Sequence, residues 1–344
     1  MSKDEFFIET ALKLAQKAGP LTYPNPKVGA VIVKNGKIIG RGYHKKFGMP
    51  HAEVEAFNNC IMDPSGGTLY VTLEPCSHHG KTPPCTDLIL SKKIKRVVCS
   101  SLDPNPKVEG AKILKEAGLE VSIAARNKEA IEINKAFFKY QQTRLPYITL
   151  KIASSMDFKI WSPRVAKLTG KKSLKLVHEL RAQVTSILVG INTILKDDPK
   201  LNVRLVKGRS PAKIILDSKL KVPLKAKALT DKNVIICTEV KSSPKRSQLE
   251  SMGIRILTFP TLQSLRKVME KLARLGHINI LVEGGQRISS SFMAQGLADK
   301  LILFVANKSL GGTGLEAITN KSIPAFKLTK VASCEQDTLL EFDL

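Results

Sequence analysis

Two short stretches of this chain carry residues that can bind a metal ion and move a proton. His51 stands two residues before Glu53, and a later proline-rich stretch holds Cys76 and Cys85. One imidazole and two thiolates supply three of the four ligands of a tetrahedral zinc ion and leave the fourth position open for water. Zinc in such a site lowers the pKa of its bound water to about 7. We therefore predict that these three side chains hold a catalytic zinc ion, and that Glu53 shuttles a proton to a leaving amine.

The secondary structure expected around these residues brings them together. The pattern predicts helices that begin at His51 and near residue 85, with a strand over residues 68–73 between them. The helix dipole at each start favours the anionic, metal-bound state of the ligands. His-x-Glu followed by Pro-Cys is typical of zinc nucleobase deaminases, although eight residues separate Cys76 and Cys85 here instead of two. The alternative is a helix-capping histidine with core cysteines, but the matched positions of both motifs favour zinc.

Length and composition indicate two soluble domains. The chain has 344 residues, of which 43% are hydrophobic and 25% are charged, enough for two cores of ordinary size. No apolar run approaches the length of a membrane-spanning helix, and the N-terminus lacks the features of a secretory signal. We therefore expect a cytoplasmic protein without membrane association, whose six cysteines form no disulfide framework.

The net charge of +25 permits a polyanionic partner. A nucleic-acid-binding or nucleic-acid-editing deaminase is the alternative function that this charge raises. The chain has no long block of like charges, and only 5% of its residues are aromatic, so platforms for stacking single strands are few. We expect a lysine-rich solvated surface and no nucleic-acid partner.

The order of the predicted elements divides the chain near residue 145. In residues 1–145, a hairpin over 28–42 precedes strands that alternate with helices, which predicts a layered α/β domain with a largely parallel sheet. Residues 146–344 hold a second series of strands and helices, with an exposed turn expected at 241–246. No internal repeat links the halves, so we predict two different α/β domains.

Several motifs of the first domain match a known pattern. They are Pro24–Gly29, Gly40–His44, Gly48–Glu53, Cys76–Cys85 and Asp103–Pro106. Together they resemble the deaminase half of the bifunctional deaminase/reductase family of riboflavin biosynthesis. The resemblance implies a cytidine-deaminase-like three-layer α/β/α domain that hydrolytically deaminates 2,5-diamino-6-(5-phosphoribosylamino)pyrimidin-4-one. It also implies substrate contacts by Asn25, His44, Lys81, Ser101 and Asn105.

The second domain carries further motifs of the same kind. They are Lys151–Asp157, Leu180–Gln183, Leu188–Thr193, Asp197–Pro199, Leu201–Arg204 and Val282–Gly285. They resemble the reductase half of that family. The resemblance implies a dihydrofolate-reductase-like α/β domain that uses NADPH to reduce the ribosyl side chain to ribityl.

The same resemblance assigns the residues of the reductase site. Lys151 and Asp197 are expected next to the reacting ribose as catalytic residues. The substrate is expected to contact Arg181, Leu201, Arg204 and Glu283. The cofactor is expected to contact Ala153, Thr193, Asp197, Gly285, Gln286, Arg287, Ile288, Ser289, Ser290 and Ser291. The last seven of these open an expected helix, whose first backbone N–H groups can hold a diphosphate.

Between Asp157 and Arg181 the sequence departs from the family pattern. Phe158 stands where the family has a glycine, and Lys167 falls near an expected tryptophan, for which Trp161 or Ser162 is a candidate substitute. This departure leaves a second hypothesis open: an active deaminase joined to a degenerate reductase domain or to an oligomerisation scaffold. We expect the protein to be a homo-oligomer.

Overall fold

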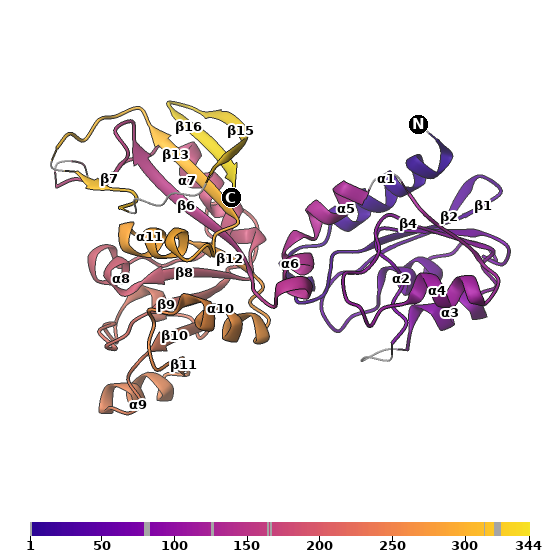
Figure 1. Ribbon diagram of the computed structural model, residues 1–344, viewed down its shortest axis with the longest axis horizontal. Coiled ribbons are helices and arrows are strands. Elements are labelled where there is room, and N and C mark those ends of the chain that lie inside the picture. The colour runs from indigo at the N-terminus through magenta and orange to yellow at the C-terminus, as the bar shows by residue number, and fades with distance from the viewer. Residues whose placement is uncertain are drawn as a thin grey trace. The chain divides into compact units, whose positions relative to one another are not determined.

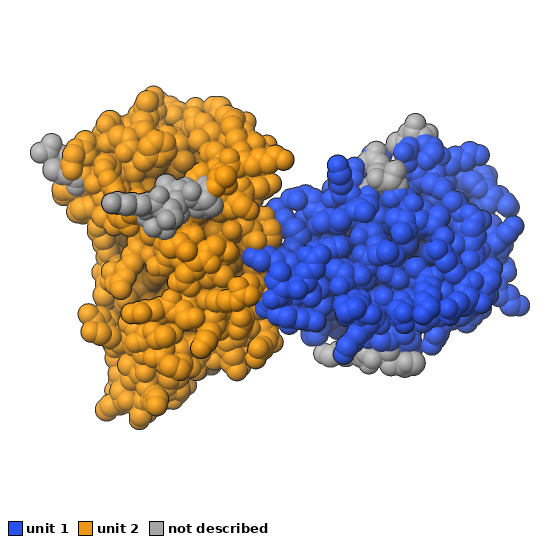
Figure 2. All heavy atoms as spheres, in the orientation of Figure 1, with its two compact units in different colours: residues 1–144 blue, residues 145–344 orange. Residues whose placement is uncertain are grey.

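The chain divides into two compact units, residues 1–144 and 145–344 (Figure 2). Each unit has its own hydrophobic core. The computed structural model describes residues 2–78, 83–124, 127–163, 165, 167–312, 314–319 and 325–344. Within those residues, no helix combines the length and the apolar character that crossing a membrane requires.

The first unit is built on a five-stranded sheet of order β2-β1-β3-β4-β5. Its strands are β1 (Gly29–Lys34), β2 (Lys37–Tyr43), β3 (Thr68–Val71), β4 (Arg96–Cys99) and β5 (Glu120–Ile123). Strand β1 is antiparallel to β2 and β3, whereas β3, β4 and β5 are parallel to each other. Asn35 and Gly36 turn the hairpin with positive φ angles of 51° and 73°. The predicted hairpin and the parallel strands after it are both present.

Helices cover both faces of this sheet, which makes three layers (Figure 1). The α-helices described in this unit are α1 (Lys3–Gln16), α2 (Ala52–Asn58), α3 (Cys85–Ser91), α4 (Gly110–Glu116), α5 (Asn127–Ile133) and α6 (Lys135–Thr143). Helices α1 and α5 pack on one face through Phe7, Ile8 and Ala130. Helices α2, α3 and α4 pack on the other through Ala56, Ile89 and Leu114. Helices α5 and α6 were not predicted from the sequence.

A close backbone contact sets the position of α2. A Cβ atom at Gly42 of β2 would overlap the carbonyl oxygen of Ala52, and one at Gly40 would overlap that of Ala56. The two glycines therefore let α2 lie directly on the sheet, which fixes where His51 stands at the start of that helix.

The second unit is built on a nine-stranded sheet of order β11-β10-β9-β8-β12-β6-β13-β16-β15. Its strands are β6 (Tyr147–Ser155), β8 (Ser186–Gly190), β9 (Ala212–Leu216), β10 (Val234–Thr238), β11 (Arg255–Thr258), β12 (Asn279–Val282), β13 (Lys300–Ala306), β15 (Lys327–Cys334) and β16 (Asp337–Asp343). The strands from β11 to β13 are parallel, and β16 and β15 extend the sheet in antiparallel fashion. A separate pair joins β7 (Lys159–Trp161) to β14 (Leu315–Glu316).

Five α-helices belong to the described part of this unit. They are α7 (Lys171–Gln183), α8 (Ile191–Asp197), α9 (Pro244–Ser251), α10 (Leu265–Arg274) and α11 (Gln286–Ala294). The prediction of an exposed turn over residues 241–246 was wrong in part, because helix α9 begins at Pro244. Ser243 caps this helix by accepting a hydrogen bond from the Arg246 N–H, and Pro244 occupies the first helical position.

Phe158 turns the chain between β6 and β7 in a backbone conformation that favours glycine. Its φ angle is +55°, and its side chain is 59% exposed. Asp157 closes the turn: its carboxylate accepts hydrogen bonds from Ser155 and from the N–H groups of Leu310 and Gly311. The left-handed conformation costs a residue with a Cβ about 1 kcal/mol, and this exposed ring recovers little of that cost by packing.

Phe158→Gly is therefore expected to be more stable than Phe158→Ala by about 1 kcal/mol, because alanine keeps the backbone strain and glycine removes it. The measurement is urea unfolding followed by the fluorescence of Trp161, the single tryptophan of the chain. Equal stability of the two variants would contradict the strain.

Candidate functional site

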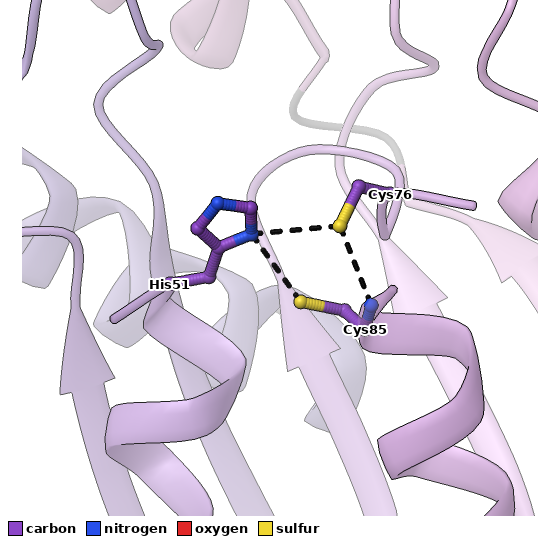
Figure 3. A group of neighbouring side chains, drawn as sticks. All are labelled: His51, Cys76 and Cys85. Atoms are coloured by element: carbon purple, nitrogen blue, oxygen red, sulfur yellow. Dashed lines mark hydrogen bonds between the residues drawn. The ribbon is translucent and has the colours of Figure 1, made fainter. Parts of the chain in front are cut away.

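The predicted zinc ligands lie together at the starts of two helices (Figure 3). His51 directly precedes α2, Cys85 is the first residue of α3, and Cys76 lies in the loop after β3. The Nδ1 atom of His51 is 3.5 Å from the Cys76 sulfur and 3.4 Å from the Cys85 sulfur. The ligand atoms of all three residues lie within 4.8 Å of one another. One imidazole nitrogen and two sulfurs at this spacing fit the donor set of a zinc ion with an open position.

Electrostatics also favour a cation between these side chains. Hydrogen bonding with Cys85 lowers the pKa of Cys76, and His51 adds to the effect. The same interaction with Cys76, together with burial, raises the pKa of Cys85. A divalent cation bound between the two sulfurs would favour the thiolate form of both.

Glu53 is buried beside this group, with only 4% of its surface exposed. Burial raises the pKa of its carboxyl group, and the nearby His51 opposes that shift. Both residues line a cavity of about 330 Å³ together with Cys76. A carboxyl group that binds a proton more readily than usual, next to a metal site, is suited to proton transfer.

The predicted substrate residues of this unit divide into three groups. Asn25, His44 and Asn105 line the cavity. Ser101 is buried outside the lining, and its hydroxyl donates to the Leu102 carbonyl at 2.9 Å. Lys81 lies outside the described residues. His44 is held from both sides, with its Nδ1 3.0 Å from the Pro50 carbonyl and its Nε2 3.3 Å from the Asn25 amide nitrogen.

The lining residues that were not predicted as site residues include Glu74, Asp103, Phe137 and Gln141. Glu74 stands two residues before a zinc ligand, and this position was a signal that could have identified it. Phe137 and Gln141 lie on α6, which was not predicted, although the helical spacing of its apolar residues was a signal that could have identified it.

Glu74 fastens the loop that carries Asp103 and Asn105. One carboxylate oxygen accepts from the Asp103 N–H at 3.1 Å, and the other accepts from the Ala111 N–H at 2.8 Å. Asp103 in turn accepts from the Asn105 N–H at 2.8 Å. Burial raises the pKa of Asp103 to about 6. Glu74 therefore orients two cavity-lining side chains without occupying the metal site.

The second unit holds a larger cavity, of about 1210 Å³, along the carboxyl ends of its parallel strands. Strands β8, β9, β10 and β12 contribute lining residues at or just beyond these ends, and β6 contributes Lys151, Ile152 and Ala153 from within the strand. Of the predicted residues, those that line it are Lys151, Ala153, Thr193, Asp197, Glu283, Gly285, Gln286, Arg287, Ile288 and Ser291. The position matches the general rule that ligands of parallel sheets bind at the carboxyl ends of strands.

Five predicted residues of this unit lie outside the lining: Arg181, Leu201, Arg204, Ser289 and Ser290. Leu201 and Ser289 are buried, whereas the Ser290 hydroxyl lies 3.2 Å from that of Thr319. Both oxygens of Glu283 accept from Arg181, at 2.7 and 2.9 Å. Arg204 is exposed. Of the two arginines, Arg204 is therefore the one more available to a ligand.

Glu283 is a buried carboxylate held by two cations. Its side chain is 7% exposed and lies 3.3 Å from the Lys151 ammonium in addition to its contacts with Arg181. Burial opposes ionisation, but the two cations outweigh it and lower the pKa of Glu283 to about 2. Glu283 is therefore a fixed anion that orients Lys151 at the cavity wall.

The segment that departs from the family pattern contributes one aromatic residue to the cavity. Trp161 lines it, and the Lys196 ammonium lies 3.3 Å from the centre of its ring. Ser162 is buried and lies outside the lining. Of the two candidate substitutes, only Trp161 therefore faces the cavity.

Comparison with known proteins matches both units. Residues 1–101 match the cytidine and deoxycytidylate deaminase zinc-binding region, and residues 146–340 match the RibD C-terminal domain. The riboflavin biosynthesis protein RibD of Aquifex aeolicus is 42% identical over 98% of both chains.

Solved structures agree over the whole chain. RibD of Acinetobacter baumannii is 34% identical, with a TM-score of 0.92 and coverage of 99% of this chain and 98% of that one. The diaminohydroxyphosphoribosylaminopyrimidine deaminase/5-amino-6-(5-phosphoribosylamino)uracil reductase of Thermotoga maritima is 36% identical, with a TM-score of 0.88 and the same coverage.

Fold and site thus define a two-domain enzyme that joins a zinc-binding deaminase domain to a reductase domain. The expected fold class, cytidine-deaminase-like followed by dihydrofolate-reductase-like, is confirmed. The chain belongs to the RibD family of riboflavin biosynthesis.

Glu74→Gln is expected to raise the KM of deamination about tenfold, because the amide nitrogen cannot accept one of the two backbone hydrogen bonds. The zinc content should stay unchanged, since Glu74 is not a ligand. Steady-state ammonia release and metal analysis measure both. Glu109→Gln, at an exposed glutamate near the same loop, is the control. An unchanged KM, or loss of zinc, would show that Glu74 does not act through the loop.

Proposed function

We propose that this protein deaminates 2,5-diamino-6-(5-phosphoribosylamino)pyrimidin-4-one and then reduces the ribosyl side chain of the product to ribityl with NADPH. The observation that carries the proposal is the meeting of His51, Cys76 and Cys85 beside buried Glu53, at the wall of a cavity. The match of the second unit to the RibD C-terminal domain supports the reductive step. The deaminase domain is assigned to residues 1–145 and the reductase domain to residues 146–344.

In the deaminase site, the protein supplies ligands, a proton carrier and a substrate wall. His51, Cys76 and Cys85 would hold zinc, which when bound supplies a Lewis acid and eases ionisation of water. The reaction exchanges the ring amine for oxygen from water and releases ammonia. Glu53 would accept a proton from the water and return it to the leaving amine, a role that its raised pKa supports.

The polar wall of the first cavity would orient the pyrimidine. Asn25 and His44 are already positioned by their mutual contact, and Asn105 is positioned by the loop that Glu74 fastens. Lys81 and Ser101 complete the proposed substrate set, Lys81 as a point charge for the phosphate.

In the reductase site, the start of α11 would hold the cofactor. The glycines that precede this helix leave its first N–H groups accessible to a diphosphate, and Gln286, Arg287 and Ile288 line the cavity there. NADPH, when bound, supplies the hydride. The proposed cofactor set is completed by Ala153, Thr193, Asp197, Gly285, Ser289, Ser290 and Ser291.

The substrate of the reductase would lie against Lys151 and Asp197, which face the same cavity. Asp197 would position or protonate the opening ribose, and Lys151 would contact its oxygens. Arg204 would hold the phosphate, while Arg181, Leu201 and Glu283 support that end of the site. Since Lys151 and Asp197 face a formed cavity, this arrangement favours an active reductase over a degenerate domain.

The proposed ligands are phosphorylated pyrimidines and NADPH, and a cytoplasmic location suits both. All six cysteines are free thiols, in keeping with such a location. The homo-oligomer and the lack of a nucleic-acid partner stay predictions.

Purified protein supplied with the pyrimidine, zinc and NADPH is expected to release ammonia and oxidise NADPH. Chelation of zinc should abolish ammonia release, while NADPH oxidation should persist with the deaminated intermediate as substrate; added zinc should restore the first step. Ammonia release without NADPH oxidation would support the degenerate-reductase alternative.

Glu53→Gln is expected to lower the kcat of deamination by about 10²–10⁴-fold, because the amide cannot carry the proton. Zinc content should be retained. Glu55→Gln, on the same helix but paired with Lys45 at the surface, is the matched control and should retain turnover. Unchanged turnover in Glu53→Gln would refute the proton-transfer role.

A further inference from the structure

A histidine that the proposed mechanism does not use lies completely buried in the reductase unit. His178 stands on α7, three residues before Arg181, and its exposed surface is 0%. Its Nδ1 atom accepts a hydrogen bond from the backbone N–H of Arg204 at 3.2 Å. Because Nδ1 is the acceptor, the ring is neutral and its proton is on Nε2.

The Nε2 atom of His178 is buried and has no hydrogen-bond partner among the described residues. A buried donor without a partner lowers stability, whereas an apolar side chain of similar size would carry no such cost. The hydrogen bond from Arg204 is therefore the feature that distinguishes histidine from an apolar residue here.

That hydrogen bond belongs to a network that holds the segment Leu201–Arg204 against α7. Arg181 donates to the Asn202 carbonyl at 3.1 Å, and the Asn202 side chain accepts from the Arg204 guanidinium at 2.9 Å. Arg181 is itself fixed by Glu283. His178 thus fixes the backbone of Arg204, and Asn202 fixes its side chain.

The charge of the network explains why a neutral acceptor suits this position. Lys151, Arg181 and Arg204 are cations, and Glu283 is the carboxylate that pairs with the first two. A further carboxylate at position 178 would neutralise a charge that a phosphate needs, and a lysine could not accept the hydrogen bond. Burial, together with Arg181 and Arg204, lowers the pKa of His178 to about 4, so the ring stays neutral.

We propose that His178 is a positioning residue of the reductase, which orients Arg204 toward the phosphate of the substrate. The inference rests on the proposed function and adds a residue to it that has no contact with the reacting atoms. It predicts that loss of the acceptor at position 178 weakens the recognition of phosphate and leaves the hydride transfer intact.

The test compares His178→Asn, which keeps an acceptor near the place of Nδ1, with His178→Leu, which removes it. His178→Leu is expected to raise the KM of the phosphorylated intermediate about tenfold, with kcat and the KM of NADPH within about twofold of wild type. His178→Asn should stay close to wild type. The KM of the dephosphorylated intermediate should be the same in all three proteins, a selectivity that a general packing defect would not produce.

Binding of ribose 5-phosphate, measured by calorimetry, gives a second readout that needs no turnover. It should weaken about tenfold in His178→Leu and be retained in His178→Asn. In an Arg204→Ala background, His178→Leu should cause no further loss, because the histidine acts through the arginine. If His178→Leu does not fold, His178→Met replaces it, since the flexible thioether fills irregular space.

Equal KM values for the phosphorylated intermediate in His178→Leu and wild type would overturn the inference, as would equal losses for the phosphorylated and dephosphorylated compounds. Failure of the proposed function is distinguishable, because wild-type protein would then not oxidise NADPH with the intermediate at all.

Discussion

The deaminase site depends on the direct contact between helix α2 and strand β2. Side chains at Gly40 and Gly42 would collide with carbonyl oxygens of the helix, so the contact requires their absence. With α2 on the sheet, His51 stands at the helix start, close to the loop that leaves β3. A helix displaced by one methyl group would carry the imidazole away from both sulfurs. The position of His51 is thus set by the packing of α2 on β2, two elements that contain none of the three predicted zinc ligands.

A second contact of this kind positions polar residues that line the first cavity. A Cβ atom at Gly110 would overlap the carbonyl oxygen of Pro75, so the start of α4 lies directly on the residue before Cys76. This approach brings the Ala111 N–H within reach of the Glu74 carboxylate, which also holds Asp103. The loop that carries Cys76 and the loop that carries Asp103 are therefore packed together.

The sequence was sufficient for features that depend on local pattern. The clustering of His51, Cys76 and Cys85 could be predicted because His-x-Glu and Pro-Cys, taken together, are typical of a zinc site. Strands β1, β3 and β8 could be predicted because short apolar runs end at turns. The sequence was not sufficient for Gln141, because the short amphipathic helix α6 that carries it was not predicted. It was also not sufficient for α9, where a short polar stretch resembles a turn until Ser243 caps it. The exclusion of Ser101 from the cavity lining also depends on tertiary packing, which spacing along the chain does not encode.

Two buried glutamates show that the neighbours of a carboxyl group decide which role it can take. Burial raises the pKa of Glu53, for which His51 offers only partial compensation, so this carboxyl group binds a proton readily. Burial acts on Glu283 as well, but Lys151 and Arg181 outweigh it and hold the pKa at about 2. Glu53 is suited to exchange a proton during each turnover, whereas Glu283 keeps its charge and serves as an anchor for cations. The difference lies in the neighbours, since burial alone would move both groups in the same direction.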